Sequence, residues 1–201
     1  MMTTRTICAL TIALAAGSAC SPLESHGNAA QSLTPAATCL PGERGYLRAQ
    51  LRGAIDSELD WRGMALQCEG GTRPGERGLR VSFAGPADAQ GRQLRIVFGV
   101  AAKPGVNARN APTNVTVIIE GRNLLYATQG DDKCTVESLS QQPLPAMRAP
   151  AAHIYRVAAR GYCINPAATL DGQGRLYINR FDFAGLARFE DNELHEETPH
   201  S

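Results

Sequence analysis

Six cysteines are the residues of this 201-residue chain best suited to chemistry. Cys8 and Cys20 lie near the start, and four lie in the body of the chain: Cys39, Cys68, Cys134 and Cys163. Four cysteines allow three disulfide pairings, and the sequence does not choose among them. We favour Cys39 with Cys68 and Cys134 with Cys163, because each pair closes a loop between neighbouring predicted elements. A zinc site is not expected, since no CxxC spacing occurs and no histidine lies near the four.

The sequence lacks the patterns of common catalytic sites. It contains no GxSxG nucleophile elbow, no HExxH and no glycine-rich phosphate loop. Among the histidines, His26, His195 and His200 fall near the ends of the chain, and His153 begins a predicted strand. We therefore expect no catalytic residue, no enzymatic activity and no cofactor.

Two adjacent carboxylates, Asp131 and Asp132, lie in a glycine-preceded turn next to Cys134. They could contribute oxygen ligands to calcium if the fold brought a further carboxylate close, the candidates being Glu69, Glu120 and Asp182. The spacing is not that of an EF-hand, and a solvated turn is the favoured interpretation. No metal ligand is assigned, and calcium binding at this turn stays open.

The N-terminus has the layout of a secretory signal. Arg5 precedes a ten-residue apolar run at positions 7–16, which is too short to span a bilayer. The run leads into Gly17-Ser18-Ala19-Cys20. These four residues resemble the lipobox of bacterial lipoproteins, in which small residues precede the cysteine that takes the lipid. Gly17 departs from the pattern, which usually has leucine there.

This resemblance implies cleavage before Cys20, acyl chains including palmitate on that cysteine, and attachment to a membrane through the N-terminal lipid. Cysteine parity agrees with it. Cys8 would leave with the leader, and consumption of Cys20 as a thioether would leave four cysteines that can pair completely. In enteric bacteria an aspartate after the lipidated cysteine tends to retain lipoproteins in the inner membrane. Ser21 therefore favours the outer membrane. We expect the domain to face the periplasm, and the sequence does not choose between the periplasm and the cell exterior.

Composition divides the chain into a signal peptide at 1–19, a flexible tether at 20–38, a folded domain at 39–189 and an acidic tail at 190–201. Loss of Arg5 with the leader would leave 19 basic and 19 acidic residues. Such a balance creates no strong field, so nucleic acid is not an expected partner. The oligomeric state stays open.

Alternating apolar and polar residues predict strands over most of the domain. The segments are 46–52, 79–83, 94–100, 115–119, 124–128, 155–159 and 176–178, with further strand-like stretches around Trp61 and Cys68. Segments 115–119 and 124–128 are expected to form a hairpin. Two short helices are expected, at 135–142 and 186–196. The pattern predicts an all-β fold, an antiparallel β-sandwich or partly open barrel of about eight strands with two disulfides.

Two groups of arginines flank predicted strands and could form an anion-binding or partner surface: Arg44, Arg48 and Arg52, and Arg73, Arg77 and Arg80. A solvated outer sheet face is the favoured interpretation. We expect a lipid-anchored domain with a binding or envelope-structural role, for which an envelope protein is a candidate partner. The alternative is a periplasmic inhibitor or immunity protein that blocks a cell-wall hydrolase.

Overall fold

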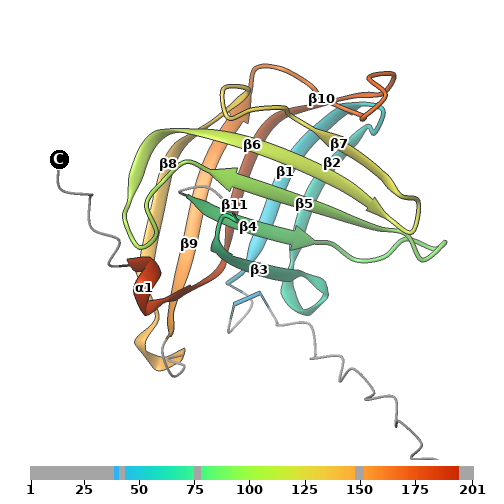
Figure 1. The fold of residues 1–201 in the computed structure, drawn as a ribbon. Helices are drawn as coiled ribbons and strands as arrows, with labels where there is room; N and C mark the ends of the chain where they lie inside the picture. Colours follow the sequence, from blue (N-terminus) through green and yellow to red (C-terminus); the bar gives the residue numbers. More distant parts are fainter. Residues whose placement is uncertain (1–38, 41–43, 75–77, 148–151, 195–201) are drawn as a thin grey trace, which may run out of the picture. The chain divides into compact units, whose positions relative to one another are not determined.

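The alternating segments form antiparallel strands that all belong to one curved sheet (Figure 1). The computed structural model describes residues 39–40, 44–74, 78–147 and 152–194. Its elements are β1 Tyr46–Gly53, β2 Ser57–Arg62, η2 Gly63–Ala65, β3 Gln67–Thr72, β4 Leu79–Ala84, β5 Gln93–Val100, β6 Ala108–Glu120, β7 Leu124–Ala127, β8 Cys134–Pro143, η3 Pro145–Met147, β9 Ala152–Cys163, β10 Ala167–Ala168, β11 Arg175–Glu190 and α1 Asp191–Leu194. The all-β prediction is confirmed, with eleven strands in place of about eight.

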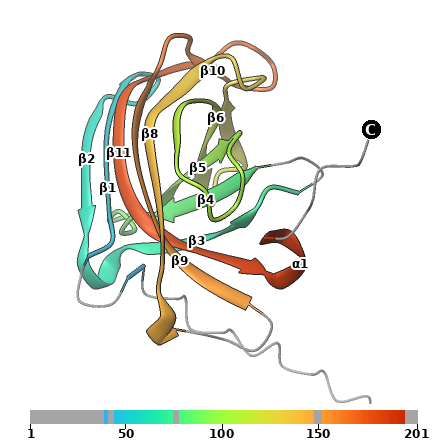
Figure 2. The ribbon, with the colours of Figure 1, turned by 90° about the vertical axis from the view of Figure 1, so that its left-hand side faces the viewer.

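The strands follow one path around the sheet, in the order β2-β1-β11-β9-β8-β6-β5-β4-β3. A second, shorter connection through β10 and β7 also joins β11 to β6. The predicted hairpin is present, with Ile119 of β6 opposite Leu124 of β7. Figure 2 shows β2, β1 and β11 side by side, and β9 lies between β11 and β8.

The two ends of this path approach each other at a seam between β3 and β11. Beyond Ala184, β11 no longer has β1 beside it, because the β1 ladder begins at Tyr46 opposite Ala184. At the seam, a methyl group added to Gly70 of β3 would overlap the carbonyl oxygen of Leu186. Glycine therefore permits a backbone approach that no other residue allows. Since β3 pairs along its length with β4 alone, contact rather than a ladder closes the barrel.

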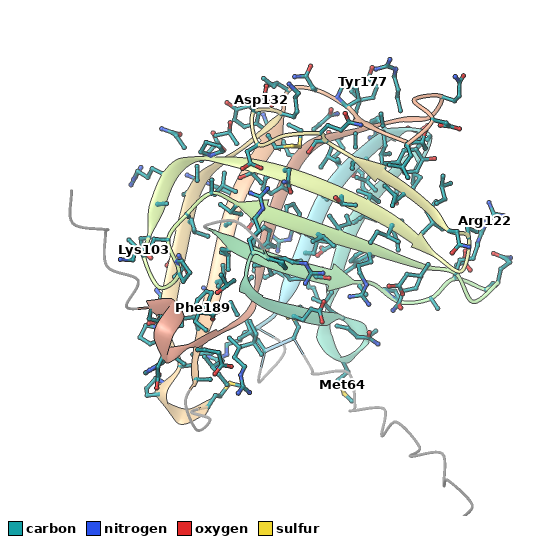
Figure 3. All side chains as sticks on the ribbon, viewed as in Figure 1. Met64, Lys103, Arg122, Asp132, Tyr177 and Phe189 are labelled. Atoms are coloured by element: carbon teal, nitrogen blue, oxygen red, sulfur yellow. A yellow bond between two sulfur atoms is a disulfide. The ribbon has the colours of Figure 1, made fainter. Side chains whose placement is uncertain are left out.

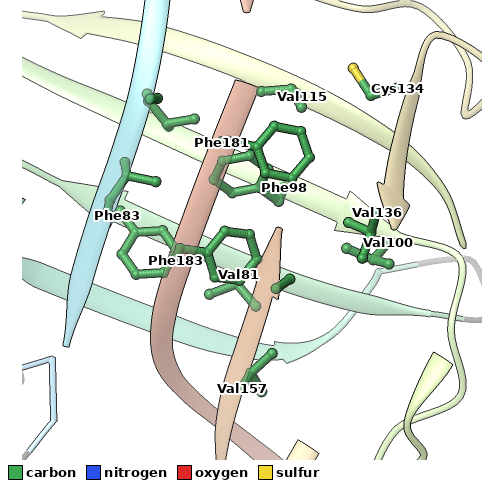
Figure 4. Close-up of a cluster of buried hydrophobic side chains, with 14 of the residues drawn as sticks. Val81, Phe83, Phe98, Val100, Val115, Cys134, Val136, Val157, Phe181 and Phe183 are labelled. Atoms are coloured by element: carbon green, nitrogen blue, oxygen red, sulfur yellow. The ribbon is translucent and has the colours of Figure 1, made fainter. Parts of the chain in front are cut away.

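Four phenylalanine rings fill the interior (Figure 4). Phe98 lies 4.8 Å from Phe181 and 4.7 Å from Phe183 between ring centroids, and Phe83 lies 5.1 Å from Phe183. All four are buried, and aliphatic residues from strands around the sheet pack against them. The inward positions of the sheet thus form a packed core, and polar side chains are left on the outer face.

The two predicted helices are wrong in different ways. Residues 135–142 belong to β8, which lies between β6 and β9. A β-bulge at Glu137 places the inward-facing Val136 and Leu139 three residues apart, a spacing that imitates a helix. Near the C-terminus, β11 continues to Glu190 and buries Ala187 and Phe189, so among the described residues of this stretch only Asp191–Leu194 is helical. The last two residues of the expected helix, 195 and 196, lie outside the described part of the chain.

Candidate functional site

The four cysteines of the domain form two disulfides, Cys39–Cys68 and Cys134–Cys163. These are the two local pairings favoured from the sequence. Cys134 and Cys163 stand opposite each other on β8 and β9, and Cys68 belongs to β3 at the barrel seam. Both bonds therefore hold elements together, and neither supplies a free thiol. The proposed lipidation residue, Cys20, lies outside the described residues.

The carboxylates considered for calcium are engaged by nitrogen donors. Asp131 accepts hydrogen bonds from Arg73 at 2.8 Å and from the amide of Asn114 at 2.9 Å. Its neighbour Asp132 lies at the end of the barrel (Figure 3) and pairs with Lys133. Among the described residues, no three His, Cys, Asp or Glu side chains gather in a group that could hold a metal ion. Through these hydrogen bonds, Asp131 links Asn114 of β6 to Arg73, the residue that follows β3.

The other candidate carboxylates are also paired with arginines. Glu69 pairs with Arg80 at 3.1 Å, and Glu120 pairs with Arg95. Asp182 also lies near an arginine, Arg48, but it differs from the other candidates in its position. It lies on the outer face of β11, within a larger set of polar residues.

His153, near the start of β9, contacts a carboxylate. Its Nε2 lies 2.8 Å from Oδ1 of Asp191, the first residue of α1. Both side chains are about half exposed, and neither lines the hollows described below. The pair joins the start of β9 to the helical turn.

A row of polar side chains crosses six strands on the outer face of the sheet. Register places its members opposite one another on β2, β1, β11, β9, β8 and β6, and they are Asp60, Arg48, Asp182, Arg160, Ser138 and Arg109. From β2 to β9 the charges alternate in sign. Over β9, β8 and β6 the charges no longer alternate. Arg160 and Arg109 stand on either side of Ser138, and no acidic residue lies between them.

Two local irregularities bring the last part of this row to the surface. On β8, the bulge at Glu137 turns Ser138 outward and Leu139 inward. On β6, Asn110 has a φ of 50°, in the left-handed region. Arg109 and Asn110 are both exposed between the inward-facing Ala108 and Ala111.

Two shallow hollows lie along this row. The first has a volume of about 680 Å³, and its floor contains small side chains from β8 and β9, among them Ser138, Ser140 and Ala158. The second, of about 1200 Å³, extends over β1, β2, β9 and β11. Arg160 and Asp182 line both, so the hollows form one continuous groove, which we call the outer groove.

The charges of the outer groove are paired at one end and unpaired at the other. Asp182 accepts a hydrogen bond from the Tyr46 hydroxyl at 2.8 Å and lies 3.9 Å from Arg48, which in turn lies 3.5 Å from Asp60. Burial, and then the hydrogen bond to Asp182, raise the pKa of Tyr46 above its ordinary value. Within the described part of the chain, neither Arg109 nor Arg160 makes an ion pair.

The arginines singled out in the sequence are mostly neutralised. Arg48 and Arg52 pair with carboxylates of β2, Arg73 pairs with Asp131, and Arg80 pairs with Glu69. Arg77 lies outside the described residues. The unpaired arginines of the groove were missed, because their convergence depends on strand register and on bulges that alternation alone does not reveal.

No family model, no curated protein and no solved structure matches the chain. In the described ranges, no helix has the length and apolar character needed to cross a membrane. The site is therefore interpreted from its own geometry. It presents hydrogen-bond donors, acceptors and net positive charge along an open surface, an arrangement suited to holding a polar ligand in place.

Proposed function

We propose that this protein is an outer-membrane-anchored lipoprotein whose periplasmic β domain binds a polar component of the cell envelope through the outer groove. In this proposal the leader is removed, Cys20 carries the lipid, and the segment that follows serves as a tether. The domain binds its ligand and does not transform it. The outer groove suits this role, since it runs across several strands and is open along its length.

One observation carries the export part of the proposal: every cysteine of the domain is consumed in a disulfide. Disulfides form and persist outside the cytosol. With Cys8 lost in the leader, Cys20 is the one remaining cysteine of the sequence. A lipid thioether at that position would leave no free thiol in an oxidising compartment.

Intact-mass analysis of the protein purified from a bacterial host tests the anchor. We expect a polypeptide beginning at residue 20, an added mass of acyl chains and a deficit of four hydrogens from two disulfides. The Cys20→Ser variant should lose the acyl mass and leave the membrane fraction. Cys8→Ser serves as the matched control, because it also removes a leader cysteine and should still give the lipidated product. A retained leader, or an unmodified thiol at position 20, would refute the proposal.

Capture experiments with the full-length Cys20→Ser variant, recovered in soluble form, test the binding role. Immobilised protein is exposed to separated envelope fractions, namely glycan, lipid and protein. Retention of glycan, lipid or an envelope assembly component supports a binding or structural role. Capture of a cell-wall hydrolase whose activity falls on binding would replace this role with that of an inhibitor.

A further inference from the structure

We propose that the first hollow of the outer groove binds a phosphate group, held by Arg109, Ser138 and Arg160. The inference deepens the proposed binding role and rests on it, because it names the chemistry of the ligand at one end of the same groove. Phosphate could come from a phosphorylated glycan or from a lipid headgroup. Both sources present the same tetrahedral anion.

The register of three strands sets the geometry. Ser138 of β8 stands opposite Arg160 of β9 on one side and opposite Arg109 of β6 on the other. The two arginines are therefore separated by two strand spacings, roughly 10 Å between backbones. Long side chains rising from either side can meet above the serine. An anion there would accept hydrogen bonds from two guanidinium groups and one hydroxyl.

The hollow has room for such a ligand because its floor is made of small residues. Ser140 and Ala158 stand opposite each other next to the Ser138–Arg160 pair, and both line the hollow. Its volume of about 680 Å³ far exceeds that of a phosphate group. A phosphorylated sugar or headgroup would extend past the anion toward Asp182, where the second hollow begins.

The electrostatics of the hollow favour an anion. Arg109 and Arg160 are the two cations that line it, and Asp182 is its one lining carboxylate. Asp182 contacts Tyr46 and Arg48, which are both on β1, the side away from Ser138. Glu137 lines the second hollow and not the first. The negative charge of a ligand phosphate would therefore give Arg109 and Arg160 the ion-pair partner that they lack among the described residues.

The number of donor groups favours phosphate over carboxylate. Guanidinium groups bind phosphate and carboxylate alike through paired N–H bonds. A carboxylate offers two oxygens in one plane, whereas a phosphate group presents oxygens in a tetrahedral arrangement. Arg109 and Arg160 stand on either side of Ser138 in the strand register, and a tetrahedral anion above the serine has enough oxygens to accept hydrogen bonds from both guanidinium groups and from the hydroxyl.

Titration of the full-length Cys20→Ser protein with inorganic phosphate, a hexose phosphate and acetate tests the inference, with binding followed by NMR. We expect phosphate and hexose phosphate to bind in preference to acetate. Arg109→Gln and Arg160→Gln should each weaken phosphate binding at least tenfold, and Ser138→Ala should weaken it less. Arg122→Gln is the matched control, because it removes an exposed arginine from the β6–β7 turn and should change binding less than twofold. In Figure 3, Arg122 lies on the opposite side of the molecule from β8 and β9.

Vesicles distinguish the two sources of phosphate. Binding to vesicles of phosphatidylglycerol, lost in Arg109→Gln and Arg160→Gln, would identify a lipid headgroup, whereas binding of hexose phosphate without vesicle binding would identify a glycan. The inference is overturned if phosphate fails to bind, if acetate binds as tightly, or if the arginine variants bind like the Arg122→Gln control. The intact mass of the wild-type protein tests separately whether Cys20 is lipidated. A failure of the phosphate inference can therefore be distinguished from a failure of the proposed lipoprotein anchor.

Discussion

Substitution of Gly70 by alanine tests how tightly the barrel closes. Gly70 lies in β3 at the seam with β11, and its backbone is not in the left-handed region. An added methyl group would overlap the Leu186 carbonyl oxygen and would also lie 3.1 Å from the Arg80 carbonyl oxygen and 3.2 Å from the Ala187 Cα. All three are backbone atoms, so no side chain can rotate away to relieve the contact.

Two opposing effects determine how much Gly70→Ala changes the free energy of unfolding. Forcing a methyl group into a packed site costs typically about 1–3 kcal/mol. Replacing glycine by alanine also restricts the unfolded chain, which stabilises the folded state by about 0.4–1 kcal/mol. We expect a net loss of about 1–2 kcal/mol in the free energy of unfolding. For a domain of this size the melting temperature falls by about 2–4 °C for each kcal/mol.

Urea and thermal unfolding under non-reducing conditions measure the effect. Gly71→Ala is the matched control, since its added methyl group would lie 3.0 Å from a single atom, the Arg188 carbonyl oxygen. We expect Gly71→Ala to lose less than half as much stability as Gly70→Ala. A Gly70→Ala protein as stable as the wild type would show that the seam is looser than the structure indicates and would refute the argument.

Three other predictions concern the second disulfide, a tyrosine and a backbone irregularity. Replacing both Cys134 and Cys163 by serine should cost about 3–4 kcal/mol in the free energy of unfolding, because the 29-residue loop is released; an unchanged urea midpoint would contradict this. The raised pKa of Tyr46 predicts that its tyrosinate absorbance, isolated as the difference between wild type and Tyr46→Phe, appears above pH 10. Protonated Tyr46 contributes its full stabilisation below the pKa that the tyrosine has in the unfolded chain, and this stabilisation is lost as pH rises through the higher pKa of the folded protein. Ionisation of Tyr46 at or below pH 10 would contradict the assignment. Asn110→Val should cost about 1–3 kcal/mol, since its φ is 50°, and should also weaken phosphate binding; Asn123→Val, at a φ of 49° in the β6–β7 turn, should cost similar stability and leave binding unchanged.

Sequence patterns predicted the sheet well where burial alternates without interruption. Residues 46–52 alternate in burial along β1, and residues 115–119 lie in the second half of β6 with Val115 and Val117 buried. The sequence allowed three disulfide pairings, and the structure contains the two local ones that were favoured because each closes a loop between neighbouring elements. Prediction failed where tertiary contacts override the local pattern, as at the end of β11, whose buried Phe189 continues the strand.

The candidate site was harder to predict, for a physical reason. An arginine on a strand shows from sequence only which face it occupies, whereas its partners depend on which residues stand opposite. Arg48 meets acids on both sides because β1 lies between β2 and β11. Arg160 has Asp182 on one side and Ser138 on the other. The two arginines therefore differ in charge compensation, because strand order and register give them different neighbours.

The misassigned strand and the candidate phosphate site have one origin. If β8 alternated regularly from the buried Cys134, Ser138 would face the core and Leu139 the solvent. The bulge at Glu137 reverses both, so it produces the helix-like spacing of Val136 and Leu139 and also exposes the serine. Asn110 does the same for Arg109 on β6, at the position opposite the bulge. Irregular strands bend and re-aim side chains at the cost of local pairing. Two such irregularities side by side, both turning polar groups toward one hollow, are the strongest structural reason to look for a ligand there.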